Sequence, residues 1–231
     1  MSDPIRLFSA ARCPYAQRTR ILLGEKALAF ELHEVDLDAP DAEFLAASPY
    51  GKVPYLAHEQ ARIWESAVIN EYLNERFPAP PMMPADPARR AWLRDWIDHA
   101  NSEMAPRFYK LLSAQGADRQ RRARAALSEA LEFIEEVALA SPMAGLYLLG
   151  DQPTLADIAY YPFFERLPAV AEHRAFEWPE KCVRLDAWQA RMAIRPAVAA
   201  TARPASYHVQ NYARYASGDV DPAKSLSTRD H

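Results

Sequence analysis

Five prolines fall within residues 77–87, whose sequence is Phe-Pro-Ala-Pro-Pro-Met-Met-Pro-Ala-Asp-Pro. Proline fixes its own φ angle and has no N–H to donate, so such a segment continues neither a helix nor a central strand. We therefore predict a stiff linker at 78–87 in this 231-residue chain. The remaining predicted units are a domain at 1–77, a domain at 88–216 and a polar tail at 217–231.

Before the linker, short apolar runs alternate with helical patterns. The expected strands are 5–9, 29–35, 53–57 and 62–64, and the expected helices are 14–26 and 66–75. Pro14 suits a first helical turn, and Ser66 is a good N-cap. The order β-α-β followed by β-β-α predicts a parallel strand pair joined by a helix, and then a hairpin. This is the order of a thioredoxin-like domain.

After the linker, the apolar period is helical throughout. Apolar residues from Trp92 to Leu111 form one long stripe, which Pro106 is expected to kink. Thr154 and Asp157 have the spacing of a capping box that opens a buried helix. The further expected helices are 127–138, 154–164, 183–192 and 196–201. The predicted fold class is therefore α/β plus all-α, a thioredoxin-like domain followed by a helical bundle.

Charge and hydropathy exclude several classes of partner. The formal charge of −4 comes from acidic and basic residues that are mixed along the chain. This pattern provides neither the basic surface of a nucleic-acid-binding protein nor a polybasic membrane anchor. The first residues lack the apolar stretch of a secretory signal, and no apolar run approaches the ~20 residues of a membrane span. We expect a cytoplasmic protein with no nucleic-acid or membrane partner, and the scattered histidines indicate no metal site.

The chain has two cysteines, Cys13 and Cys182, far apart in sequence. This excludes a disulfide framework and fits a reducing compartment. Cys13 lies between a predicted strand and a predicted helix, where free helical N–H groups would stabilise a thiolate, and Arg12 would add to this effect. We therefore expect a lowered pKa and a nucleophilic thiol at Cys13. The simpler alternative is a small buried cysteine in a turn.

Position 16 is alanine, so Cys13 has no second cysteine one turn further on to resolve a mixed disulfide. An external thiol must then attack the mixed disulfide and release the free enzyme. Glutathione is the abundant thiol of a reducing compartment and is our expected partner. Cys182 could act as a resolving thiol, but a structural role is favoured.

Two other segments could bind a peptide-like thiol. Val53-Pro54 precedes a predicted strand, where a cis peptide bond would let the backbone of Val53 pair with an extended ligand. Ser66 opens a predicted helix, so its N–H and hydroxyl can bind a carboxylate, while Glu65 can take an ammonium group. The alternatives are an ordinary trans turn and an ordinary helix cap.

Taken in this order, the motifs resemble those of the cytosolic glutathione transferases, and within them the cysteine-type members: the omega class and its bacterial relatives, which include glutathione lyases. The matching segments are Cys13-Pro-Tyr-Ala-Gln-Arg-Thr-Arg20, Gly51-Lys-Val-Pro-Tyr55, Glu65-Ser66 and Thr154-Leu-Ala-Asp157. The resemblance covers about residues 5–203.

The resemblance implies a role for each matching residue. Cys13 would form a mixed disulfide with glutathione, and Tyr15 would form part of the wall of the site. Val53, next to a cis-Pro54, would pair with the cysteinyl backbone, and Lys52 would meet the glycyl carboxylate. Glu65 and Ser66 would hold the γ-glutamyl end.

The resemblance also implies a homodimer and an acceptor pocket in the second domain. The candidate pocket residues are Trp96, Phe108, Tyr109 and Trp178, although aromatic residues on helices more often belong to a core. The aromatic segment 207–215 could fold over the pocket or over the subunit.

Three functional hypotheses follow. The first is a glutathione-dependent thiol transferase, or a deglutathionylating reductase or lyase, in which Cys13 attacks the sulfur of a glutathionyl substrate. The second is a conjugating transferase, in which glutathione is the nucleophile and Ser9 or Tyr15 supplies a hydroxyl. The third is a non-catalytic regulatory binding protein that shares the fold. The acceptor substrate is left open.

Overall fold

Four strands form one mixed sheet in the computed structural model, which describes residues 4–220. The strands are β1 (Ile5–Ser9), β2 (Phe30–Glu34), β3 (Tyr55–His58) and β4 (Ala61–Trp64), in the order β2-β1-β3-β4. β1 is parallel to β2, with Leu7 opposite Leu32, and antiparallel to β3, with Leu7 opposite Leu56. β3 and β4 form the expected hairpin. Residues 221–231 of the predicted polar tail lie outside the described residues.

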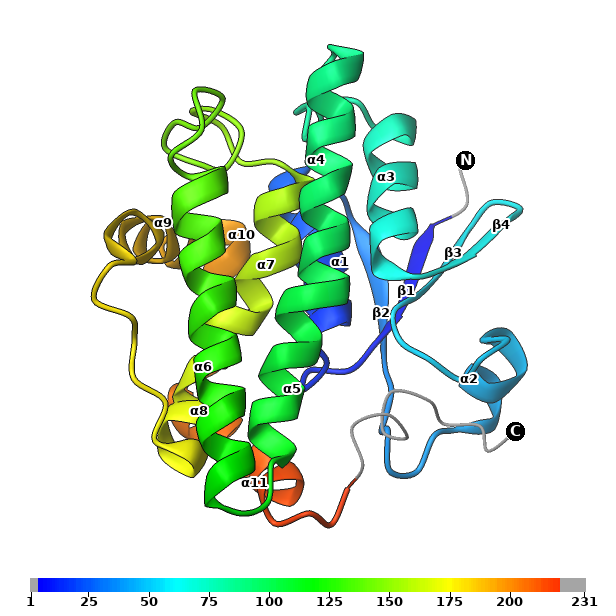
Figure 1. The fold of residues 1–231 in the computed structure, drawn as a ribbon. Coiled ribbons are helices and arrows are strands. Elements are labelled where there is room, and N and C mark those ends of the chain that lie inside the picture. The colour runs from blue at the N-terminus through cyan, green and yellow to red at the C-terminus, as the bar shows by residue number, and fades with distance from the viewer. Residues whose placement is uncertain (1–3, 221–231) are drawn as a thin grey trace.

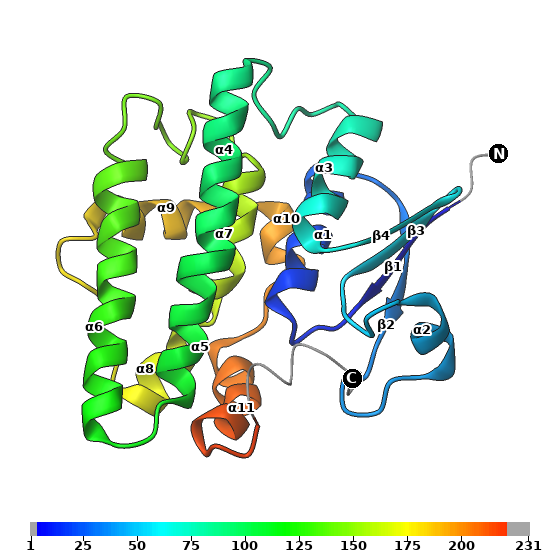
Figure 2. The ribbon, with the colours of Figure 1, turned by 45° about the vertical axis from the view of Figure 1, so that its right-hand side comes forward.

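Three helices pack on the two faces of this sheet. They are α1 (Pro14–Glu25), α2 (Ala42–Ala47) and α3 (Ser66–Arg76). α1 and α3 lie between the sheet and the second domain, whereas α2 covers the opposite side (Figures 1 and 2). β1 alternates accordingly: Leu7 joins the core that contains α1 and α3, and Phe8 packs on Phe44 of α2.

The second domain is all-helical. Its elements are α4 (Pro87–His99), η1 (Ala100–Met104), α5 (Ala105–Ser113), α6 (Ala117–Phe133), η2 (Ile134–Ala138), α7 (Leu155–Glu165), α8 (Leu167–Arg174), α9 (Val183–Ala193), α10 (Pro196–Ala199) and α11 (Ala205–Ala216). The predicted fold class, α/β plus all-α, is confirmed. Within the described residues, no helix is long and apolar enough to cross a bilayer.

Helix α7 is the centre of this domain, and every residue from Leu155 to Phe164 is buried. Its predicted capping box is present: the backbone N–H and the hydroxyl of Thr154 both donate to Oδ2 of Asp157, at 2.8 and 2.9 Å. The second oxygen, Oδ1, accepts from the N–H of Leu148 and from the indole of Trp188. One buried carboxylate thus joins three segments of the domain.

Helices α2, α8 and α11 were not predicted from the sequence. Asp41 caps α2 by accepting from the N–H of Phe44 at 2.8 Å, a local bond in a helix too short to show an apolar period. The helical run around Pro106 is continuous but irregular: α4 passes directly into the π-helical segment η1, and Pro106 is the second residue of α5, which follows without a break. Because the preceding turn is helical, the missing N–H of Pro106 falls inside the run, next to the wider π-helical turn. The expected kink at Pro106 stays a prediction.

Candidate active site

Cys13 is the N-cap of α1, at the point where the chain leaves β1. Its sulfur accepts a hydrogen bond from the N–H of Ala16 at 3.4 Å, and its thiol donates to the carbonyl oxygen of Val53 at 3.7 Å. The side chain is 8% exposed. The turn therefore aims the sulfur at the first N–H groups of the helix, as the sequence predicted, and keeps it mostly away from water.

The direction of the pKa shift at Cys13 differs from the expectation. Burial raises the pKa of the Cys13 thiol, because a thiolate loses its hydration in this position. The N–H groups of Ala16 and Tyr15 and the charges of Arg166 and Arg20 lower the pKa, but by less than burial raises it. The sequence motif showed the helix N-terminus; it did not show how deeply the sulfur would be buried.

The segment before β3 forms the wall opposite Cys13. The peptide bond between Val53 and Pro54 is cis, as predicted. The hydroxyl of Ser48 donates to the carbonyl of Lys52 and accepts from its N–H, each at 3.1 Å, which holds the turn together. Gly51 has a φ of +59°, a conformation that favours glycine. The side chain of Lys52 is exposed and lines the cavity described below.

Glu65 and Ser66 follow β4, and their roles at the helix start are reversed from the prediction. Glu65 is the N-cap, with a left-handed φ of +67°, and Ser66 is the first helical residue. Ser66 is buried, and its hydroxyl accepts from the guanidinium of Arg18 at 3.3 Å. Glu65 stays exposed. Both residues line the same cavity as Cys13.

Arg18 does not line the cavity but contacts three residues that do, Ser66, Asn101 and Tyr15, and the sequence analysis gave it no role. It is buried, donates to Oδ1 of Asn101 at 2.7 Å and lies over the ring of Tyr15. Burial lowers the pKa of Arg18 to about 10. Within residues 4–220, its Nη2 has no hydrogen-bond partner. A basic residue among the apolar positions of the predicted helix 14–26 was the available signal.

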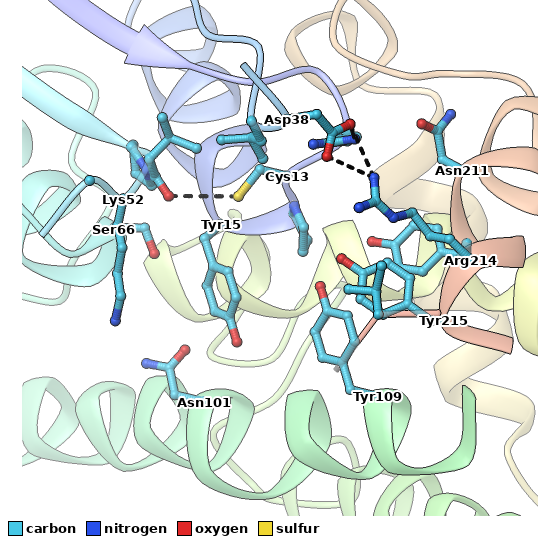
Figure 3. A pocket seen from close by; sticks show the side chains of 18 of the residues that line it. Cys13, Tyr15, Asp38, Lys52, Ser66, Asn101, Tyr109, Asn211, Arg214 and Tyr215 are labelled. Atoms are coloured by element: carbon cyan, nitrogen blue, oxygen red, sulfur yellow. Dashed lines mark hydrogen bonds and ion pairs between the residues drawn. The ribbon is translucent and has the colours of Figure 1, made fainter. Parts of the chain in front are cut away.

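A cavity of about 580 Å³ joins these parts across the two domains (Figure 3). The predicted site residues that line it are Cys13, Tyr15, Lys52, Val53, Pro54, Glu65, Ser66 and Tyr109. Tyr15 extends from α1 toward Asn101, and Tyr109 rises from α5 on the other side of the opening. The structure thus brings together the cysteine, the cis-proline turn and the start of α3, which are far apart in sequence.

The last described helix closes one end of the cavity. Tyr212 and Tyr215 of α11 lie near Tyr109, with ring centroids 6.3 and 5.9 Å away. Arg214 of α11 contacts Asp38 at 2.9 Å, and Asp38 also contacts Arg12 at 2.6 Å (Figure 3). The aromatic segment 207–215 therefore folds over the pocket, one of the two alternatives left open by the sequence.

Three candidate acceptor residues are not among the described residues that line this cavity. Trp96 and Phe108 are buried in the helical core. Trp178 borders a separate surface hollow and donates from its indole to the carbonyl of Cys182 at 3.3 Å. Periodicity showed that these aromatic residues face inward, but an inward-facing residue can meet either a core or a cavity.

Cys182 is buried and precedes α9 as its N-cap. Burial, together with the nearby carboxylates of Glu135 and Glu132, raises the pKa of this thiol to about 11. It does not line the cavity of Cys13 among the described residues. These features indicate a structural cysteine.

Comparison with known proteins gives the family. Residues 7–81 match the family described as "Glutathione S-transferase, N-terminal domain", and residues 117–191 match "Glutathione S-transferase, C-terminal domain". Glutathione S-transferase omega-1 of Sus scrofa is 28% identical over 85% of this chain and 79% of its own. A Stringent starvation protein A homolog of Coxiella burnetii is 30% identical over 72% of this chain and 78% of its own.

Solved structures show the same fold. Rice GST1 in complex with glutathione superimposes with a TM-score of 0.85 at 26% identity, covering 94% of this chain and 98% of that one. With both domains matched, the chain belongs to the glutathione S-transferase family.

Proposed function

We propose that this protein is a glutathione-dependent thiol transferase, or a deglutathionylating reductase or lyase, with Cys13 as the nucleophile. Glutathione is the co-substrate of the family. The observation that carries the proposal is a cysteine at the N-terminus of α1, in the same cavity as the cis-proline turn and the start of α3.

In this proposal the cavity holds glutathione along its length. The backbone of Val53 pairs with the cysteinyl residue, and Lys52 meets the glycyl carboxylate. Ser66 receives the γ-glutamyl carboxylate, and Glu65 receives the ammonium group. What supports these assignments is that all four residues line the cavity and that Ser66 lies at a helix N-terminus.

The reaction divides into two exchanges. The thiolate of Cys13 attacks the sulfur of a glutathionyl substrate, an S–S bond forms between Cys13 and glutathione, and the former partner leaves with the bonding electrons. The thiolate of a second glutathione then attacks this mixed disulfide, which yields glutathione disulfide and restores Cys13. With a disulfide substrate the leaving group is a thiolate, and the enzyme is a thiol transferase. With a thioether substrate the leaving group is a carbanion that takes up a proton on carbon, and the enzyme is a lyase.

We place the acceptor beside Tyr15, Tyr109, Tyr212 and Tyr215; the support for this is that all four line the cavity. Burial raises the pKa of Tyr15 and of Tyr109, so both phenols stay protonated near neutral pH and can donate hydrogen bonds to a bound acceptor. We further propose that the protein works as a homodimer in the reducing environment of the cytoplasm.

A conjugating transferase is the second candidate. The observation that favours it is the raised pKa of Cys13, which leaves a bound glutathione thiol as the alternative nucleophile. The two reactions differ in their need for Cys13. Conjugation requires a hydrogen-bond donor near the glutathione sulfur, which serine provides, whereas thiol exchange requires a sulfur on the enzyme.

The test compares the wild type with Cys13→Ser and with Cys182→Ala as the matched control. With a glutathione mixed disulfide as substrate, we expect turnover by the wild type and by Cys182→Ala, and loss of at least a hundredfold in Cys13→Ser. Retention on immobilised glutathione is measured for all three. Full turnover of the mixed disulfide by retained Cys13→Ser protein would contradict Cys13 as the nucleophile. Wild type that is retained but does not turn the disulfide over would favour conjugation, and wild type without retention or turnover would favour a non-catalytic binding protein.

A further inference from the structure

Arg166 is a fully buried cation of the helical domain that reaches the turn carrying Cys13. It follows the last residue of α7, and its Nη2 donates to the carbonyl oxygen of Arg12 at 3.4 Å. Arg12 is the residue directly before Cys13. A side chain from one domain thus contacts the backbone of the turn that holds the sulfur in the other.

The guanidinium is held in this position from both domains. Its Nη1 donates to the side-chain oxygen of Gln17 at 2.5 Å and to the carbonyl of Pro162 at 2.7 Å. Gln17 lies one turn after Cys13 on α1, and its N–H donates to the carbonyl of Cys13 at 3.1 Å. Arg166 therefore contacts the backbone on one side of Cys13 and, through Gln17, the helix on the other side.

The carboxylate of Glu165, next to Arg166 in the sequence, is bound in a buried network. Glu165 accepts from the amide of Gln17 at 2.7 Å and from His208 of α11 at 2.8 Å. Burial would raise the pKa of Glu165, but these bonds and the charge of Arg166 lower it. Glu165 is ionised, and its two oxygens are bound by groups other than the guanidinium.

The other charged and titratable groups around Cys13 come from both domains. Those of the first domain are Arg12, Tyr15, Arg18, Arg20, Asp38, Lys52 and Glu65. Those of the second domain and of the segment after α11 are Tyr109, Tyr212, Tyr215, Arg214 and Asp219. Burial raises the pKa of Tyr15, Tyr109 and Tyr212, which keeps these phenols uncharged near neutral pH. Arg12 and Arg214 share the carboxylate of Asp38, and Lys52 and Glu65 are exposed to water.

Three arginines interact electrostatically with Cys13: Arg166, Arg20 and Arg18. Arg18 is buried too, but it donates to other segments and not to the turn that carries Cys13. Arg20 and Arg166 both contact this turn: Arg20 is half-buried and donates to the carbonyl of Ala10, and Arg166 is fully buried, where a charge is screened least. We propose that Arg166 is a positioning residue for the nucleophile: it fixes the Cys13 turn across the domain interface and favours its thiolate.

The inference rests on Cys13 being the nucleophile of the proposed function, but its test needs no turnover. The rate of alkylation of Cys13 by iodoacetamide is measured against pH in full-length protein that carries Cys182→Ala, so that a single thiol reacts. Arg166→Gln is compared with Arg166→Lys and with Arg174→Gln. Arg174 is the matched control, a buried arginine at the far end of α8 that donates to the carbonyls of Leu111 and Ala216.

We expect Arg166→Gln to raise the midpoint of the profile by about one pH unit, which slows alkylation about tenfold at neutral pH. Arg166→Lys should recover at least half of this shift, because it keeps the charge but cannot make both bonds. In Arg174→Gln, the alkylation rate of Cys13 should have the same midpoint pH as in the parent protein. A profile for Arg166→Gln that superimposes on the parent, or an equal shift in Arg174→Gln, would overturn the inference.

If Arg166→Gln does not fold, Gln17→Met carries the test. This variant removes the side-chain oxygen that accepts from Nη1 and the amide that binds Glu165. It keeps the cation of Arg166 but holds it less firmly at the turn. Alkylation should then slow about threefold at neutral pH, and an unchanged rate would overturn the inference. Failure of the proposed function looks different, since a protein that alkylates normally but shows no exchange with glutathione would leave the effect of Arg166 on the thiol intact.

Discussion

At the scale of single residues, the chemistry depends on opposing influences on one sulfur. The helix N-terminus and two arginines favour the thiolate of Cys13, and burial favours the thiol. The same burial keeps water from the sulfur, which protects a mixed disulfide from competing reactions. The raised pKa of Cys13 therefore comes from its burial in the folded protein and not from the Cys-Pro motif itself.

The first prediction concerns the pH dependence of Cys13. Because burial raises the pKa of its thiol above the ordinary value of about 8.5, the thiol is the main form at pH 7 and the thiolate increases tenfold with each pH unit below the midpoint. We expect the rate of alkylation in Cys182→Ala protein to keep rising between pH 7 and about pH 9. The free thiol of glutathione serves as the control. A rate that is already constant at neutral pH would show a lowered pKa instead.

The residue scale also shows what sequence alone can predict of the site. Cys13, the cis bond before Pro54 and the start of a helix at Ser66 each have a local signal, and each was found. Arg18 and Arg166 act through contacts with distant segments, at Asn101 and at Arg12. The sequence pattern shows a basic residue within the predicted helix 14–26, but it shows neither of these contacts. The burial that sets the pKa of Cys13 depends on the whole fold in the same way.

At the scale of elements, the capping box of α7 organises the helical domain. Asp157 is fully buried and accepts four hydrogen bonds, from Thr154 twice, from Leu148 and from Trp188. The sequence predicted the two local bonds because their spacing is fixed within one helical turn. The other two join α7 to the preceding loop and to α9, and they required the structure.

We expect Asp157→Ala to lower the free energy of unfolding by about 3 kcal/mol, because it leaves buried donors without acceptors. Urea unfolding at a fixed protein concentration measures the loss. Asp95→Ala is the control, since Asp95 is exposed on α4 and should change the stability by less than about 0.5 kcal/mol. Equal losses in the two variants would contradict the role given to the box.

At the scale of the whole molecule, the cavity is a product of the domain interface. α1 packs on α7 and α10, and Cβ of Ala197 in α10 lies so near Gly24 that a side chain there would clash. At the cavity mouth, Asp38 of the first domain binds Arg214 of α11. The two domains and their helical order follow from the sequence pattern, but their mutual placement comes from these contacts between distant residues.

The contact of Asp38 with α11 leads to a prediction about motion. Arg12 and Arg214 lower the pKa of Asp38 to about 2, so the carboxylate and its ion pairs persist down to strongly acidic pH and are lost only as the pH approaches that value. The side chain is half-exposed, so we expect Asp38→Asn to cost no more than about 1 kcal/mol. The expected result is a local opening of α11.

Amide hydrogen exchange measures this opening. In Asp38→Asn, exchange in α11 should accelerate by up to about fivefold while exchange in α7 stays unchanged. Glu59→Gln is the control, because Glu59 pairs with Arg76 within the first domain. Unchanged exchange in α11, or equal acceleration in both helices, would show that Asp38 does not hold the helix over the cavity.

The most direct test of the central claim is the intact mass of the protein after incubation with a glutathione mixed disulfide. The account predicts one glutathionyl group on the wild type and on Cys182→Ala, none on Cys13→Ser, and loss of the adduct when reduced glutathione is added. An adduct that persists on Cys13→Ser, or a wild type that never forms one while it turns the substrate over, would contradict Cys13 as the nucleophile.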